Sequence, residues 1–223
     1  MAVHLMEEAN RCLQCKVPKC REQGCPIHTN IPEMIRLFRE HDLETAAAML
    51  FANNPLSVIC SLVCDHGAQC EGHCVRGIKG EPVHISGIEN YISNSFFERL
   101  KLEKAPDNGM KAAVIGAGPA GMTIAILLAQ KGYRITVFET RDKIGGILRY
   151  GIPEFRLPKE KVVQKEIENV KALGVSIETD AIVGKALTID SLLEEEGFDA
   201  VFVGSGAGLP KFMGIPGEQA LGV

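Results

Sequence analysis

The residues best suited to chemistry in this 223-residue chain are eight cysteines, all of which lie before residue 75. Along the chain they fall into two runs with short internal spacings: Cys12, Cys15, Cys20 and Cys25, then Cys60, Cys64, Cys70 and Cys74. Cysteines spaced in this way usually form either disulfides or metal sites. The first residues contain no basic stretch followed by an apolar run, so they predict no export to an oxidising compartment. We therefore expect thiolate metal ligands in a reducing, cytoplasmic setting.

Three kinds of metal site compete for these thiols: structural zinc, one iron-sulfur cluster, or two clusters. Zinc sites commonly pair two C-x2-C knuckles or combine cysteine with histidine, whereas this chain has a single C-x2-C, at Cys12 and Cys15. Iron-sulfur clusters use several nearby cysteines and a remote one, often with a proline after a ligand, as at Cys25 and Pro26. The spacing favours iron and sulfur, and the count of thiols fits one cluster or two.

Composition excludes several other classes of protein. The net charge is -4 and the isoelectric point is near 5.9, with no long basic stripe, which argues against a nucleic-acid surface. The absence of tryptophan and an aromatic content of 5% remove stacking platforms for single strands. No run of about 18 apolar residues is present, so we expect no transmembrane helix and no membrane partner.

The pattern along the chain predicts an α+β multidomain protein, divided at the turn-rich stretch 105–109. An all-α domain over residues 1–106 should carry the cysteines in loops or at helix ends. Its helices are predicted over 31–38, from 42 to before 53, and over 85–102. Asn30 and Glu33 have the spacing of a capping box at the start of the first of these.

Residues 110–223 are predicted to form an α/β domain of the Rossmann type. Strand patterns alternate with helical patterns, which implies a parallel sheet. The strands are predicted over 111–115, 133–139, 175–178 and 200–204. One helix is predicted to follow the glycine motif as far as residues 130–132, and two more are predicted over 159–173 and near 188–196.

A dinucleotide-binding motif opens this second domain. Gly116, Gly118 and Gly121 follow the first strand directly and start a helix, and Glu139 ends the next strand. The first glycine permits a tight turn, the second lets backbone approach a pyrophosphate, and the third lets helix and strand pack closely. Glu139 would accept hydrogen bonds from a ribose diol.

The form of the motif, Val-Ile-Gly-Ala-Gly-Pro-Ala-Gly over 114–121, resembles that of flavoproteins with two dinucleotide-binding domains. Gly145 and Gly146, and the late glycine-rich stretch 203–208, add to this resemblance. It implies FAD as the bound dinucleotide.

A cysteine-rich domain followed by a flavin domain resembles the small (beta) subunit of NADPH-dependent glutamate synthase and its relatives. These relatives include the N-terminal region of dihydropyrimidine dehydrogenase and the large subunit of NADH-dependent ferredoxin:NADP reductase. The resemblance covers nearly the whole chain and rests on these segments in addition to the flavin motifs: 11–15 (RCLQC), 24–26 (GCP), 54–56 (NPL), 70–74 (CEGHC), 88–89 (IE) and 150–158 (YGIPEFRLP).

This resemblance implies two [4Fe-4S] clusters. The first would bind Cys12, Cys15, Cys20 and Cys74. The second would bind Cys25, Cys64, Cys70 and Glu89, which leaves Cys60 as a spare thiol. Eight thiols would also fill two four-cysteine clusters, with Cys60 in place of Glu89; we favour Glu89, because an oxygen ligand is one way to adjust cluster potential.

The same resemblance implies FAD contacts at Gly116, Gly118, Pro119, Ala120, Gly121, Glu139, Gly145, Gly146, Arg156 and Val183. The implied function is an oxidoreductase component that passes electrons from NAD(P)H through FAD and the clusters to a larger catalytic subunit or to ferredoxin. The alternatives are an NADH/ferredoxin:NADP transhydrogenase subunit and a zinc-stabilised, dinucleotide-sensing interaction module. No catalytic acid or base is expected in this chain.

The chain departs from the family pattern in three ways. Four residues separate Cys20 from Cys25 where the relatives have three, and Asp65 stands where a proline commonly follows the cysteine. The sequence also ends at residue 223 without a second GxGxxG, so we expect an incomplete FAD domain and an NADPH site outside this chain. We interpret the chain as a fragment of a protein about twice as long, because an interrupted sheet would expose an unpaired edge.

Overall fold

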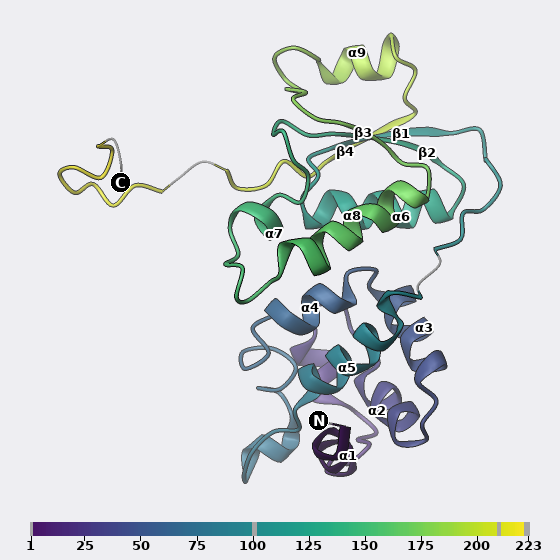
Figure 1. Ribbon diagram of the computed structural model, residues 1–223, viewed down its shortest axis with the longest axis vertical. Coiled ribbons are helices and arrows are strands. Elements are labelled where there is room, and N and C mark those ends of the chain that lie inside the picture. The colour runs from purple at the N-terminus through teal and green to yellow at the C-terminus, as the bar shows by residue number, and fades with distance from the viewer. Residues whose placement is uncertain (1, 100–101, 209–210, 221–223) are drawn as a thin grey trace.

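The computed structural model describes residues 2–99, 102–208 and 211–220, and it shows a bundle of helices followed by a layered α/β sheet (Figure 1). The helices of the first part are short and are joined by the cysteine-bearing segments. They are α1 (Ala2–Asn10), α2 (Ile31–Arg39), α3 (Leu43–Asn53), α4 (Ser57–Val63) and α5 (Ile85–Phe97), with the single turns η1 (Cys20–Gly24) and η2 (Val75–Ile78).

Apolar residues at helical spacing bring these helices together. Ile88 and Ile92 of α5 are completely buried, and α5 packs against α2, α3 and α4. Asp42 caps α3 by accepting a hydrogen bond from the Thr45 amide at 3.1 Å. The predicted capping box at Asn30 is wrong, because the Asn30 side chain makes no capping bond and Glu33 pairs with Arg36 instead.

The second part contains a four-stranded parallel sheet with the order β3-β2-β1-β4. Its elements follow the alternation predicted from the sequence. They are β1 (Lys111–Ile115), α6 (Pro119–Gln130), β2 (Arg134–Phe138), α7 (Ile147–Tyr150), η3 (Lys159–Val163), α8 (Gln164–Ala172), β3 (Ser176–Glu178), α9 (Ile189–Glu194) and β4 (Ala200–Val203). The α+β fold class and the parallel sheet are confirmed.

Helices cover both faces of this sheet (Figure 1). α6 and α8 pack on one face and α9 lies on the other, where Phe138, Leu192 and Phe198 form a small core. The register pairs Ile115 with Phe138, so the strands β1 and β2 end at the same edge. The segments that follow these two residues therefore meet at the carboxyl edge, where α/β sheets bind ligands.

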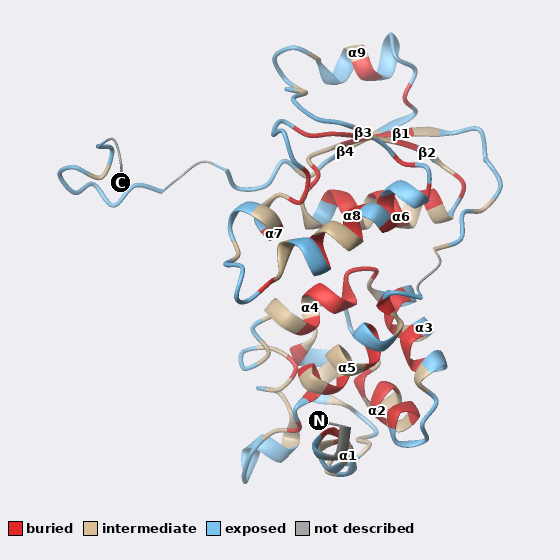
Figure 2. Cartoon of the chain, viewed as in Figure 1, coloured by how far each residue is buried: buried red, intermediate tan, exposed pale blue. Residues whose placement is uncertain are grey.

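The two parts share one apolar core, which runs from the helices through α8 and α6 to the sheet (Figure 2). Lys165 of α8 forms an ion pair with Glu98, just after α5, at 3.6 Å. Beside this pair, a groove is lined from one side by Leu62 and Phe97 and from the other by the loop before α8. By contrast, the described residues after β4 are largely exposed and lead away from the sheet (Figure 2).

Within the described residues, no single helix has both the length and the apolar character needed to cross a membrane. The bent pair α3 and α4 meets these criteria only when taken together, by length and composition alone.

Candidate electron-transfer site

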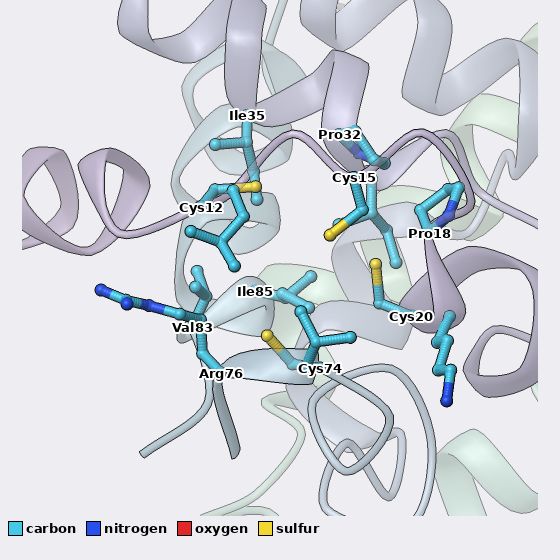
Figure 3. Close-up of a pocket in the computed structure, with 14 residues that line it drawn as sticks. Cys12, Cys15, Pro18, Cys20, Pro32, Ile35, Cys74, Arg76, Val83 and Ile85 are labelled. Carbon is cyan, nitrogen blue, oxygen red and sulfur yellow. The ribbon is translucent and has the colours of Figure 1, made fainter. Parts of the chain in front are cut away.

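Four cysteines from distant parts of the helical bundle line one pocket (Figure 3). Cys12 and Cys15 follow α1, Cys20 begins η1, and Cys74 immediately precedes η2. Their sulfur atoms point towards a common space between these segments (Figure 3). The structure thus brings together the four residues predicted to hold the first cluster, and we call these four the first cysteine group.

Local backbone geometry positions the three thiols of the segment 12–20. Gln14 has a positive φ of 49°, which turns the chain between Cys12 and Cys15, and its side-chain amide donates to Cys12 Sγ at 3.5 Å. The Pro18 carbonyl accepts the amides of the next turn and so starts η1 at Cys20. Hydrogen bonds to ligand sulfur of this kind adjust the potential of an iron-sulfur cluster.

The rest of this first pocket is apolar. Ile35, Val83 and Ile85 form its wall (Figure 3). Burial raises the pKa of the Cys12 thiol and raises that of Cys20 to about 11, and the neighbouring thiols add to both shifts. Four cysteines around one apolar pocket are the donor set of a [4Fe-4S] cluster, and the residues fit that group. No three metal-binding side chains of the described residues lie close enough together to hold a single ion.

A second group of donors lies between α4 and α5 and the loop before η2. Burial raises the pKa of Cys70 to about 12, and the charges of Glu89 and Cys25 are close enough to contribute. The Cys64 thiol has a raised pKa because of its hydrogen bond with Cys60, with further contributions from burial, Glu89 and Cys70. The three cysteines and the glutamate predicted for the second cluster are therefore neighbours in the fold. We call Cys25, Cys64 and Cys70 the second cysteine group.

Glu89 is half-buried on α5 and accepts a hydrogen bond from Ser57 Oγ at 2.9 Å. Burial raises the pKa of its carboxyl group to about 7, against the lowering effect of this bond. Cys25 has a different environment, because the amide and hydroxyl groups of Thr29 both lie 3.4 Å from its sulfur. Glu89 has the position expected of a ligand, and its assignment stays a prediction.

Cys60 lies within α4, so the expectation that every cysteine occupies a loop or a helix end is wrong for this residue. Its hydrogen bond with Cys64 lowers its pKa to about 7, and burial opposes that shift. Cys60 is near enough to Glu89 for their charges to interact. The geometry therefore keeps both candidates for the eighth ligand beside the same group of cysteines.

The glycine motif forms the turn between β1 and α6. Gly116 has a φ of +97°, and a Cβ atom there would lie 2.4 Å from the Gly204 carbonyl oxygen. A Cβ atom on Gly121 would lie 1.9 Å from the Gly116 oxygen, whereas one on Gly118 would meet only Gly146 Cα, at 3.9 Å. The first and third glycines are therefore required by the fold, and the second faces open space where a phosphate can approach. Pro119 and the exposed Ala120 begin α6.

The double glycine at 145–146 lies against this turn. The Gly145 amide donates to the Ala117 carbonyl at 2.9 Å, and both glycines have a positive φ, of 122° and 51°. A Cβ atom on Gly146 would lie 2.7 Å from Gly118 Cα. These two predicted FAD contacts thus lie beside the glycine motif in space.

Glu139 is buried at the end of β2, with 8% of its surface exposed. One carboxylate oxygen accepts the Ala117 amide at 2.8 Å, and the other accepts the Arg141 amide at 3.0 Å. The carboxylate is thus held at the glycine turn, and each oxygen keeps a lone pair for a ribose hydroxyl. The residues of this turn fit a dinucleotide.

The remaining two predicted contacts lie further along the chain. Val183 is half-buried and packs against the small core beneath α9, two residues after Ala181, whose amide donates to Glu139 O at 3.0 Å. Arg156 is exposed and lines the groove between the two parts. Its charge is close enough to His66, next to the second cysteine group, to contribute to the lowered pKa of that histidine, whose main cause is burial.

The structure also reveals two buried polar residues that the sequence did not indicate. Glu166 of α8 is 1% exposed and Asn169 is 8% exposed, and Glu166 Oε1 and Asn169 Nδ2 have no hydrogen-bond partner among the described residues. Glu166 is near enough to Cys60 for their charges to interact. No sequence signal marks it, because its burial depends on packing between the two parts of the chain.

Comparison with known proteins agrees with this geometry. Residues 2–101 match the family described as dihydropyrimidine dehydrogenase domain II, 4Fe-4S cluster, and residues 114–159 match the NAD(P)-binding Rossmann-like domain. The glutamate synthase [NADPH] small chain of Escherichia coli K12 is 36% identical over 219 residues, which are 97% of this chain and 46% of that protein. The chain is a homologue of the glutamate synthase small chains.

Two further relatives are similar to nearly the whole of this chain. The glutamate synthase [NADPH] small chain of Halomonas elongata is 37% identical, over 97% of this chain and 46% of its own length. The NAD-dependent dihydropyrimidine dehydrogenase subunit PreT of Escherichia coli O157:H7 is 35% identical, over 93% of this chain and 51% of its own length. This chain therefore spans about half the length of these relatives.

Proposed function

We propose that this chain is the iron-sulfur and flavin part of an NAD(P)H-dependent oxidoreductase of the glutamate synthase small-chain type. Residues 1–106 would form a domain with two [4Fe-4S] clusters, and residues 110–223 would form part of an FAD domain. The NADPH site would lie outside this chain. The observation that carries the proposal is the convergence of Cys12, Cys15, Cys20 and Cys74 on one pocket, in a chain that also builds a dinucleotide turn.

Each implied group would bind residues that the structure describes. The first cluster would bind the four thiolates of the first pocket. The second would bind Cys25, Cys64, Cys70 and Glu89, and the glycine turn with Glu139 would hold the FAD. Bound FAD would exchange hydride for single electrons, and bound clusters would carry those electrons one at a time.

The order of the sites along the molecule supports this function. Arg156, from the loop before α8, is close enough to His66 for their charges to interact. Glu166 of α8 is likewise close enough to Cys60 for a charge interaction. The second cysteine group thus lies on the side of the bundle that faces the flavin part. The first group lies with α1 and η2, at the end of the molecule far from the sheet (Figure 1). Electrons would therefore leave FAD through the second cluster and then the first.

A larger catalytic subunit or a ferredoxin would be the acceptor of these electrons, and the protein would act in the cytoplasm. A second candidate function is a subunit of an NADH/ferredoxin:NADP transhydrogenase. One observation favours such a related role, since the similar PreT is named as a subunit of an NAD-dependent enzyme. The same cofactors would serve in both cases, with a different acceptor.

Iron, acid-labile sulfide and flavin analysis of anaerobically prepared protein tests the proposal. We expect about eight iron and eight sulfide per chain, as two [4Fe-4S] clusters require, and a brown protein with a flavin spectrum when FAD is added. Colourless protein with stoichiometric zinc would overturn it and would favour the zinc-stabilised, dinucleotide-sensing module.

A further inference from the structure

The segments that carry the first cysteine group also form an unusual patch of surface. Beside the pocket, three large apolar side chains are exposed: Leu13 by 58%, Val17 by 75% and Ile78 by 74%. Leu13 lines the pocket itself, Val17 lies between Cys15 and Pro18, and Ile78 ends η2. Exposed apolar side chains gathered at one site are typical of surfaces that bind another protein.

The charge of this patch is opposite to that of the chain as a whole. The segments 12–20 and 74–80 contain no acidic residue, although the net charge of the chain is -4. Their four cationic side chains are all exposed: Lys16, Lys19, Arg76 and Lys79. Exposed apolar side chains accompanied by cations are typical of a protein interface that uses electrostatic attraction to orient its partner.

The position of the patch connects it with electron transfer. Lys19 and Arg76 line the pocket of the first cysteine group, and Arg76 stands at its edge (Figure 3). All four thiols of this pocket are only half-buried. A partner seated on the patch would therefore lie directly over the first cluster, at the end of the molecule far from the sheet.

We propose that this patch, formed by the exposed side chains of segments 12–20 and 74–80, is the docking surface for a redox protein with an acidic surface over its own redox centre. The proposal rests on the proposed function, because it takes the first cysteine group as the point where electrons leave the chain. Charge complementarity selects the partner: acidic side chains would meet the four cations, and apolar side chains would contact Leu13, Val17 and Ile78.

Stopped-flow electron transfer tests this surface. The full-length protein, loaded with its cofactors and reduced anaerobically by light and deazaflavin, is mixed with an oxidised acidic [2Fe-2S] ferredoxin as the probe. We expect the second-order rate constant to fall at least about 10-fold when the salt concentration rises from about 0.05 M to 0.5 M, because screening weakens long-range attraction. A rate constant independent of salt would contradict the proposal.

Two variants locate the effect on the patch. Lys16→Glu combined with Lys79→Glu should slow the reaction at low salt by about 10-fold, whereas the matched control Lys131→Glu with Lys171→Glu should leave the rate near that of the parent. Val17→Ser with Ile78→Ser should weaken binding of the same ferredoxin without changing the salt dependence. Equal effects of the two charge reversals would overturn the docking surface.

The spectra of the clusters separate this test from the proposed function. If the electron paramagnetic resonance spectra of every variant show two clusters and only the docking results fail, the surface is wrong and the electron-transfer function stands. If the parent protein binds no iron, the proposed function fails first. Faster reaction with a basic acceptor such as cytochrome c than with the acidic ferredoxin would also overturn the surface.

Discussion

Arg11 holds both carboxylate oxygens of Glu8 through one nitrogen, with distances from Nη1 of 2.8 Å to Oε1 and 2.7 Å to Oε2. The same guanidinium also donates to the backbone carbonyls of Glu81 and Pro82, and Glu8 accepts the His84 amide at 3.0 Å. This pair therefore joins the end of α1 to a loop more than 70 residues later in the sequence. The two joined segments carry Cys12 on one side and Val83, in the wall of the same pocket, on the other.

Loss of this pair should damage the first cluster selectively. In Arg11→Gln, two backbone carbonyls lose their donor and Glu8 loses its counter-charge, which we expect to cost about 2 kcal/mol of local stability. Iron should then fall from about eight towards about four per chain, with one of two cluster resonances retained. Iron analysis and electron paramagnetic resonance after anaerobic reconstitution provide the measurement.

A matched control is available on α2. Arg36 pairs with Glu33 at 2.7 Å and with Glu40, which directly follows the same helix, so these pairs join no distant segments. Arg36→Gln should therefore leave both cluster resonances unchanged. If Arg36→Gln and Arg11→Gln lose iron equally, the loss reflects general destabilisation and Arg11 has no special role in placing the first cluster.

Substitutions at the glycine turn should separate folding from ligand binding. A methyl group at Gly118 meets no atom closer than 3.9 Å, so Gly118→Ala should keep the thermal midpoint of the apoprotein while weakening FAD binding at least about 10-fold by blocking close approach. Gly116→Ala should instead lower the thermal midpoint, because its Cβ would lie 2.4 Å from the Gly204 oxygen.

Thermal unfolding and fluorescence titration with FAD measure the two effects. Gly80→Ala serves as a control, because a Cβ atom there has open space and the residue lies in the helical part. Unchanged FAD affinity in Gly118→Ala would show that the dinucleotide does not use this turn.

The sequence predicted those parts of the fold that depend on local pattern. β1 begins and ends at the predicted residues, and α6 ends at Gln130, within the predicted 130–132, because the glycine motif marks the turn between them clearly. α4 was not predicted, since its short apolar run follows Pro55 without a clear helical period. The helix at 85–102 ends earlier than predicted, at Phe97.

The candidate site was predictable only in part, because local sequence pattern indicates residue types and not which distant segments meet. Spacing identified the cysteines as ligands, but their division into two groups came from a family resemblance, since Cys74 joins Cys12 across more than 60 residues of chain. The Arg11 and Glu8 pair and the burial of Glu166 depend on contacts between distant segments. A pattern of residue types contains no information on such contacts unless the packing of the whole chain is known.

Substitutions of Glu89 and of Cys60 should have different effects on the second cluster, because we expect only Glu89 to be a ligand. Because the Glu89 carboxylate lies among Cys64 and Cys70, Glu89→Ala should change the resonance of one cluster and leave the other intact. Cys60→Ser should change neither, and Glu98→Ala, just beyond the same helix, is the control. Loss of a cluster in Cys60→Ser would mean that the eighth ligand is this thiol.

Glu166 should give the protein a pH-dependent stability. Burial raises the pKa of its carboxyl group to about 8, with Asn169 acting in the opposite direction and Cys60 adding to the rise. The folded chain therefore binds a proton that the unfolded chain, with a pKa near 4.5, has lost at neutral pH. The contribution of Glu166 to the free energy of unfolding is therefore greatest below about pH 4.5. This contribution declines as the pH rises from there to about 8.

Replacement of this group by a neutral amide should remove the decline. Glu166→Gln is expected to unfold at a temperature at least about 4 °C higher than the parent at pH 8, and at nearly the same temperature at pH 4.5. Glu168→Gln, on the exposed side of the same helix, should change neither value. Thermal unfolding followed by circular dichroism at both pH values is the measurement. An equal rise in the unfolding temperature at pH 4.5 and at pH 8 would contradict the prediction. It would mean that the amide of the variant packs better than the carboxyl group, and that the charge of Glu166 is tolerated in the folded protein.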